Sequence, residues 1–237
     1  MRIVITRPQA DGERSATALR TLGHEVLVAP LMKVDAVPAD LSGHWGAVIV
    51  TSANAPGAIA NNSARDSLIT LPLVAVGRRS ADAAQQAGFT AITTAGGDVG
   101  DLVRMLNTQR ADAKAPLLYI AGEDRAADLI GELSARGIAA ELRVVYRTVT
   151  MPLSLELTEA LEAGEVDAVL HFSRRSAENY LAGAKRAGVF APALLVRHFC
   201  LSTQVAEPLI DAGTTNVAIA TRPNEAALIE LLRVSKP

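Results

Sequence analysis

The chain of 237 residues is long enough for one large α/β domain or for two small ones. Hydrophobic residues make up 49% of it and aromatic residues only 3%, so the interior must be built from Ala, Val, Leu and Ile. The 23 basic and 25 acidic side chains give a formal net charge of -2, which argues against a general binding surface for nucleic acid or an anionic membrane.

Short runs rich in Val and Ile alternate along the chain with helical patterns rich in Ala and Leu. Such runs are typical of strands that are buried on both faces of a parallel sheet. The predicted strands cover residues 2–7, 25–30, 47–52, 73–78, 90–95, 117–122, 139–146, 167–173, 195–202 and 216–222. Several intervening helices end in a glycine that can adopt a left-handed conformation, namely Gly23, Gly88, Gly137 and Gly213. This repetition predicts open α/β sheets, in which ligands bind at the carboxyl ends of the strands.

Two segments break the alternation. Residues 29–38 and 143–152 are extended, rich in β-branched side chains and closed by a proline, so we interpret them as paired crossovers. Because ten strands are many for one open sheet of this length, we predict two sheets of five strands. Residues 1–33 and 149–237 would form a discontinuous first domain, and residues 36–146 an inserted second domain, with crossovers near 30–38 and 143–152.

The single Cys200 stands in an apolar run, and we expect it to be a small buried side chain. No run of about 18 apolar residues occurs, and no signal-peptide pattern precedes the first predicted strand, so we expect a cytoplasmic protein. The histidines at 24, 44, 171 and 198 share no ligand spacing with cysteine or acidic residues, which argues against a structural metal site.

Hydroxyls, small residues and arginines dominate the predicted strand ends, where acidic residues are sparse. These ends read TRP at 6–8, TSAN at 51–54, GRRS at 77–80, AGEDR at 121–125, FSRRS at 172–176, LSTQ at 201–204 and TRP at 221–223. Helix starts beside such residues offer free backbone N–H groups and a favourable dipole to an anion. The ends together predict a site for several carboxylates or phosphates, with Arg7, Arg78, Arg125, Arg174 and Arg175 alongside.

A local interpretation of the same residues stays open. Ser52, Ser80, Ser176 and Thr203 are also expected to cap their own helices, and each arginine can be a solvated surface charge. The fingerprints of dinucleotide sites, P-loops and serine-hydrolase elbows are missing. What remains is a polyanion held without a metal or a cofactor.

The ordered segments VITRPQADGERSATALRTLGHEVLVAPLMKV, TSANA, LVAVGRRSADAAQQAG, LLYIAGEDRAADLIGELSARGIAAELRVVYRT, HFSRRSAENYL and CLSTQVAEPLIDAG resemble the uroporphyrinogen-III synthase family over nearly the whole chain. The resemblance implies two open parallel-sheet domains, flavodoxin-like or Rossmann-like, joined by a two-stranded β-ladder with a cleft between them. It also implies an enzyme of haem and tetrapyrrole biosynthesis, a cyclising carbon-oxygen hydro-lyase. Its substrate would be hydroxymethylbilane, a linear carboxylate-rich tetrapyrrole that is closed to uroporphyrinogen III with loss of water and inversion of ring D, without a cofactor.

The resemblance also assigns site residues. The tyrosine of the family's crossover motif falls on Tyr146, which is the candidate proton donor; the alternative is that Tyr146 only packs and hydrogen-bonds at the ladder. The implied substrate-binding residues are Thr6, Arg7, Thr51, Ser52, Ala53, Gly77, Ser80, Gly122, Arg125, Ser173, Ser176, Ser202 and Thr203. The chain departs from the family pattern at Gln204, within Ser202-Thr203-Gln204-Val205-Ala206, and at Ala121, where a basic residue is frequent and for which Arg125 would compensate.

Two other functions remain open on the sequence. One is a non-catalytic two-domain binding protein for a carboxylate-rich or phosphorylated small molecule, and the other is an inactive paralogue of the enzyme family. Both share the expected fold, so the fold alone does not separate them from the enzyme. The resemblance further implies a monomer that receives its substrate in a transient hand-over from the preceding enzyme of the pathway, with no nucleic-acid or membrane partner.

Overall fold

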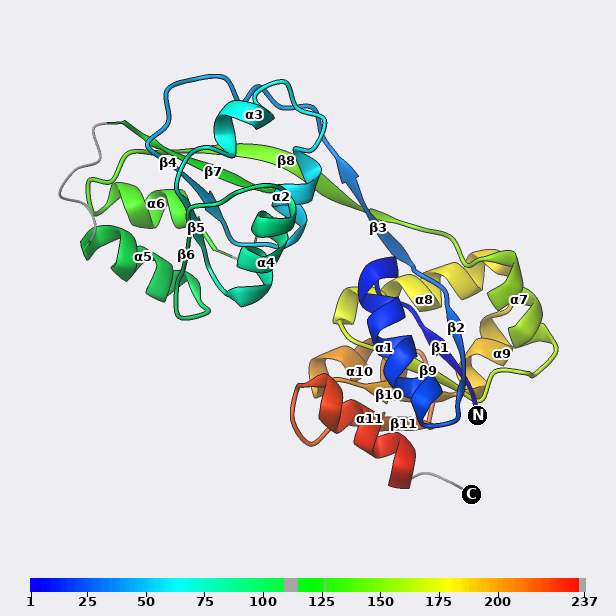
Figure 1. Cartoon of the computed structure of the whole chain (residues 1–237). Coiled ribbons are helices and arrows are strands. Elements are labelled where there is room, and N and C mark those ends of the chain that lie inside the picture. Colours follow the sequence, from blue (N-terminus) through cyan, green and yellow to red (C-terminus); the bar gives the residue numbers. More distant parts are fainter. Residues whose placement is uncertain (109–114, 126, 235–237) are drawn as a thin grey trace. The chain divides into compact units, whose positions relative to one another are not determined.

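The computed structural model describes residues 1–108, 115–125 and 127–234, and its contacts divide the chain into two compact units (Figure 1). Unit 1 comprises Met1–Lys33 and Val149–Pro237, and unit 2 comprises Val34–Thr148. Each unit is a parallel-dominated sheet with helices on both faces. The predicted α/β fold class is therefore confirmed.

The sheet of unit 1 has five parallel strands in the order β11-β10-β9-β1-β2. The strands are β1 (Arg2–Ile5), β2 (Glu25–Val28), β9 (Ala168–His171), β10 (Arg197–Cys200) and β11 (Val217–Ile219). The helices are α1 (Gln9–Thr21), α7 (Leu155–Glu162), α8 (Arg174–Ala187), α9 (Phe190–Leu195), α10 (Thr203–Asp211) and α11 (Glu225–Val234).

Alternation along the strands builds two cores in unit 1. Val4 faces a cluster that includes buried residues of α7, α8, α9 and α10, whereas Ile3 and Ile5 face α1 and α11. All three side chains are fully buried, and each such burial contributes about 1.5 to 3 kcal/mol. Both faces of the sheet are thus covered, which leaves its strand ends as the places where polar side chains can gather.

Unit 2 is built in the same way around a sheet in the order β3-β8-β7-β4-β5-β6. Its strands are β3 (Met32–Ala36), β4 (Ala47–Val50), β5 (Leu73–Ala75), β6 (Ile92–Thr94), β7 (Leu117–Gly122) and β8 (Ala140–Thr150). Its helices are α2 (Asn54–Ala58), α3 (Arg65–Leu68), α4 (Arg78–Gln86), α5 (Val99–Thr108) and α6 (Leu129–Ser134). Buried residues of α2, α3 and α4 pack on one face of this sheet, and those of α5 and α6 pack on the other.

The two segments interpreted as crossovers are hydrogen-bonded strands, β3 and β8. Their pairing is flanked by bonds from Val37 N to Val145 O and from Met151 N to Leu31 O, both 2.8 Å. Residue numbers rise on one strand as they fall on the other, so the pair is antiparallel. Addition of β3 makes this sheet six-stranded, which corrects the expected two sheets of five strands.

All ten predicted strands occur, and most are two to four residues shorter than predicted. The exceptions are β7, which has the predicted bounds, and β8, which extends through the second crossover because β3 supplies a partner. The glycines predicted to end helices all have positive φ angles, with 82° at Gly23, 107° at Gly88, 66° at Gly137 and 97° at Gly213. In the part of the chain that the structure describes, no helix is long and apolar enough to cross a membrane.

Candidate active site

A pocket of about 410 Å³ lies at the carboxyl edge of the sheet of unit 2. Because β8, β7, β4 and β5 run parallel, the residues at the ends of β7, β4 and β5 meet at this edge, beside Tyr146 within β8. Five residues predicted from the sequence line the pocket, namely Thr51, Ser52, Gly122, Arg125 and Tyr146. The lining is mostly neutral, with hydroxyls from three of these residues, although Asp98 and Asp124 also contribute.

Tyr146 reaches the pocket from β8. The side chain is only 8% exposed, and it packs against the apolar cluster on the face covered by α2, α3 and α4. On the neighbouring strand its partner in register is Gly122, the last residue of β7. The phenol therefore lies at the pocket beside the carboxyl end of β7.

Tyr119 is a second phenol in the pocket wall, and it was not among the residues predicted from the sequence. It stands on β7, is 3% exposed, and its hydroxyl lies 2.8 Å from Thr51 Oγ1, where either group can donate. Burial raises the pKa of the Tyr119 phenol above its ordinary value, against smaller opposing effects of the Thr51 hydrogen bond and of Arg125. Tyr119 thus stays protonated at neutral pH. The sequence does contain one indication of this contact: a tyrosine within a buried strand usually has a hydrogen-bond partner for its hydroxyl.

Arg125 braces the loop that follows β7. One nitrogen, Nη1, donates to the carbonyl oxygens of Gly122 and Glu123, each at 2.8 Å. Asp98 also makes a hydrogen bond within the protein, since its Oδ1 accepts the backbone N–H of Asp101 at 2.7 Å in the first turn of α5. Arg125 and Asp98 therefore hold the loops of the pocket.

The other residues predicted for unit 2 lie outside the described lining of the pocket. Ala53 is the residue before α2, Gly77 is the residue before α4, and Ser80 is buried in the first turn of α4. Ser52, in contrast, lines the pocket, and its hydroxyl accepts the N–H of Asn54 at 3.2 Å.

In unit 1 the predicted residues are not gathered around a described pocket. Thr6 is fully buried, and its hydroxyl donates to the carbonyl oxygen of Leu170 at 3.3 Å. The guanidinium of Arg7 donates to Ser15 Oγ and to Glu225 Oε2, both at 3.0 Å, and lies 4.2 Å from the centre of the Phe172 ring. The first strand end of the chain thus contacts α11, the last helix, through Glu225.

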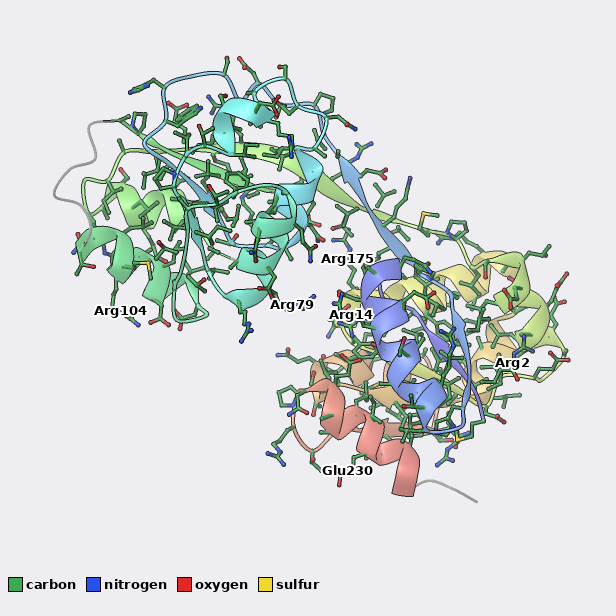
Figure 2. All side chains as sticks on the ribbon, viewed as in Figure 1. Arg2, Arg14, Arg79, Arg104, Arg175 and Glu230 are labelled. Atoms are coloured by element: carbon green, nitrogen blue, oxygen red, sulfur yellow. The ribbon has the colours of Figure 1, made fainter. Side chains whose placement is uncertain are left out.

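Ser173 and Ser176 form a reciprocal capping box at the start of α8. The Oγ of Ser173 accepts the N–H of Ser176 at 3.1 Å, and the N–H of Ser173 points to the Oγ of Ser176 at 3.3 Å. Arg174 pairs with Glu178 and Glu207. Arg175 follows Arg174 in the first turn of α8, and Arg79 follows Arg78 in the first turn of α4 (Figure 2).

The expectation that four hydroxyl residues cap their own helices holds for Ser176, a member of the capping box of α8, whereas Ser52, Ser80 and Thr203 are not at N-cap positions. The residues at the caps are Ala53 for α2, Gly77 for α4, Ser173 for α8 and Ser202 for α10. The expected Ser52, Ser80, Ser176 and Thr203 lie one to three residues away from these caps. The helices α4, α8 and α10 begin earlier in the chain than the hydroxyl pattern suggests, and α2 begins one residue later. Ser202 is half-buried and Thr203 is exposed.

Comparisons with known proteins find a matching family and similar solved structures. A family model described as uroporphyrinogen-III synthase HemD matches residues 13–230. Uroporphyrinogen-III synthetase from Helicobacter pylori is similar over 100% of both chains, with 19% sequence identity and a TM-score of 0.68. A mutant uroporphyrinogen III synthase from Thermus thermophilus is similar over 98% of both chains, with 19% identity and a TM-score of 0.50.

No curated protein matches the sequence. At 19% identity the solved structures show a shared fold. The family model, in contrast, matches most of the chain and spans residues from both units. The chain belongs to the uroporphyrinogen-III synthase family.

Proposed function

We propose that the protein is a uroporphyrinogen-III synthase, a cyclising carbon-oxygen hydro-lyase that converts hydroxymethylbilane into uroporphyrinogen III. The observation that carries this proposal is the family match over residues 13–230, which includes every residue of the pocket in unit 2. The pocket supports it with a phenol, Tyr146, beside further hydroxyl groups from Thr51 and Tyr119.

We propose that this pocket receives the reacting end of the substrate. The ring of the hydroxymethyl-bearing pyrrole is neutral and its carboxylates lie on side chains, so the ring suits a pocket that includes two aspartates, Asp98 and Asp124, better than those carboxylates do. Loss of hydroxide leaves positive charge on the pyrrole, and nearby carboxylates stabilise such charge in a poorly solvated site. The carboxylates of the substrate would then bind to hydroxyls and backbone amides elsewhere.

In the proposed reaction Tyr146 donates its proton to the leaving oxygen. The bond between that oxygen and the hydroxymethyl carbon breaks, the pyrrole nitrogen supplies the electron pair, and water is released. Ring D then attacks the same carbon through its substituted position, which gives a spiro intermediate. The bond from that position to the methylene that joins rings C and D breaks, and the methylene forms a new bond to the free α-carbon of ring D, which inverts the ring. A proton is lost when the pyrroles of the product regain aromaticity, and it balances the proton given by Tyr146. Holding ring D in place supplies much of the rate.

Among the predicted residues of unit 1, Ser202 and Thr203 are proposed as binding residues for the carboxylates of the substrate. Ser202 and Thr203, at the start of α10, are accessible for this purpose, since one is half-buried and the other exposed. Thr6 and Arg7 have protein partners and would have to exchange them to bind a carboxylate. Action as a monomer and transfer of the substrate from the preceding enzyme are part of the same proposal.

The decisive experiment supplies freshly prepared hydroxymethylbilane and separates the product isomers by chromatography. We expect the type III isomer to form in excess over the type I isomer that arises without enzyme. Formation of the type I isomer alone, at the rate seen without protein, would overturn the proposal. Tight binding of the substrate without turnover would instead favour the binding protein or the inactive paralogue.

A further inference from the structure

The strands β7 and β8 pair irregularly where they meet the pocket. Ala121 is opposite Val144, but the next residue, Gly122, is opposite Tyr146, so Val145 is an extra residue on β8. This is a β-bulge, a feature that re-aims side chains and is frequent beside active sites. In a regular strand, neighbouring side chains point to opposite faces. Here Val145 and Tyr146 both belong to the same buried cluster, which is the expected effect of the bulge.

The bulge places the phenol of Tyr146 directly against the backbone of Gly122. A Cβ atom built on Gly122 would lie 2.5 Å from Cζ of Tyr146, 2.7 Å from Cε2 and 2.8 Å from the hydroxyl oxygen. Real Cβ atoms essentially never approach other atoms so closely. Gly122 has no positive φ angle, so its backbone conformation does not itself require glycine. Space for the phenol is therefore the reason that the structure gives for glycine at this position.

The backbone around Gly122 is held by further hydrogen bonds. The N–H of Glu123 donates to the carbonyl oxygen of Tyr146 at 2.9 Å, which ties the two strands together just beyond the bulge. Arg125 Nη1 holds the carbonyl oxygen of Gly122 at 2.8 Å. The surface on which the phenol rests is thus fixed from the strand side and from the loop side.

We infer that Gly122 is a positioning residue for the reaction, which together with the bulge at Val145 sets the place of the Tyr146 hydroxyl in the pocket. This inference rests on the proposed function, because it assigns Gly122 an effect only through the phenol. A side chain at position 122 pushes the ring away by the space of a methyl group or more. A displacement of about 1 Å in a catalytic group can lower a rate by about 10²-fold.

The test is a double-mutant cycle with Gly122→Ala and Tyr146→Phe, assayed for the type III isomer. We expect Gly122→Ala to lower kcat by about 10²-fold while KM changes little, because the hydroxyl is displaced from the reacting oxygen. Added to Tyr146→Phe, which has no hydroxyl to misplace, Gly122→Ala should cost little more. Gly57→Ala is the matched control, since α2 lies in the same unit and a Cβ at Gly57 meets nothing within 4 Å.

Full activity of Gly122→Ala, or losses that simply multiply in the double variant, would overturn the inference. A structural measurement on the unaltered protein decides the case if Gly122→Ala does not fold. Nuclear Overhauser contacts between the Gly122 Hα protons and the Tyr146 ring are expected, and their absence from a folded protein would also overturn it. If the unaltered protein shows these contacts but makes no type III isomer, the proposed function fails while the position of the phenol stands.

Discussion

The carboxyl edges of the two sheets have similar residues but different surroundings. In unit 1, Arg7 is bonded to Ser15 and Glu225, and Ser173 is bonded to Ser176, so these polar groups satisfy one another. In unit 2, Thr51 and Tyr146 line a pocket of about 410 Å³. The comparison shows that a run of hydroxyls and arginines at strand ends does not by itself identify a binding surface.

A physical difference underlies the contrast. Unit 1 closes with α11, which brings Glu225 beside the first strand end and gives Arg7 a carboxylate partner. In unit 2, Arg125 in the loop that follows β7 instead binds backbone carbonyl oxygens, and not the hydroxyls of the pocket, in the described structure. Changes at the edge of unit 2 should therefore lower turnover, and changes at Arg7 should lower the stability of unit 1.

The largest expected effect is that of Tyr146→Phe. Removal of a proton donor in a general acid step lowers kcat by about 10²- to 10⁴-fold, and the retained ring should keep the fold intact. The measurement is the initial rate of type III isomer formation, together with thermal unfolding. Tyr180→Phe is the control, because the hydroxyl of Tyr180 donates to Ala193 in the core of unit 1 and should affect stability but not the rate. An unchanged rate in Tyr146→Phe would remove the proton-donor role.

The next effect concerns two buried histidines in unit 1. Nε2 of His171 lies 3.1 Å from Nδ1 of His198, both side chains are fully buried, and the outer ring nitrogens have no hydrogen-bond partner in the described structure. Burial holds the pKa of His171 well below its usual value and lowers that of His198 to about 4. Tyr180 and Cys200 lie nearby, and burial raises the pKa of each, so both stay neutral in acid.

The sign of the pH dependence follows from these shifts. Both histidines are neutral in the folded unit, and they bind protons more readily once it unfolds. Their contribution is complete above about pH 6.5 and is lost as the pH falls toward 4, with about 2 kcal/mol lost at pH 5 from His198 alone. Circular dichroism should detect the loss of secondary structure when unit 1 unfolds. The fluorescence of Trp45, the single tryptophan, monitors unit 2.

A control separates this effect from general acid denaturation. His198→Leu removes one titrating group from the pair, so the loss of stability between pH 7.5 and pH 5 should shrink. His44→Gln changes an exposed histidine of unit 2 and should leave the loss unchanged. The assignment to the buried pair is wrong if both variants retain the full pH dependence.

A smaller effect is expected for Tyr119→Phe. Either group can donate in the bond between Tyr119 and Thr51. Because a phenol is a stronger acid than an aliphatic hydroxyl, we expect Tyr119 to donate, which leaves the proton of Thr51 free to bind an oxygen of the substrate. Loss of this arrangement should lower kcat/KM by about tenfold, which corresponds to about 1.4 kcal/mol. Thr51→Ser keeps the hydroxyl and should remain close to full activity, whereas Thr51→Val should match Tyr119→Phe. A double variant with multiplied losses would show that the two hydroxyls act separately.

Much of the fold could be predicted because local patterns determine it. Buried runs of Val and Ile mark the strands, and Gly23 and Gly137 mark helix ends through positive φ angles. Within the site, Thr51 and Gly122 were predicted because they follow strands. Tyr119 was missed because it lies inside a strand, and a periodic pattern does not tell how far a phenol extends along the sheet. The bond from Arg7 to Glu225 joins residues 218 positions apart, which no local pattern reveals.

The smallest effect, and the one that tests the comparison most directly, is that of Arg7→Ala. The side chain is 17% exposed and holds Ser15, Glu225 and the face of Phe172, so its loss should destabilise unit 1 by about 1 kcal/mol. Activity of the folded protein at a temperature well below the transition should be retained. Glu225→Gln preserves the size of the partner and should reproduce part of the loss of stability. If Arg7→Ala instead abolishes formation of the type III isomer while the thermal transition is unchanged, Arg7 binds the substrate. The edge of unit 1 then belongs to the active site as that of unit 2 is proposed to, and the contrast between the two edges is wrong.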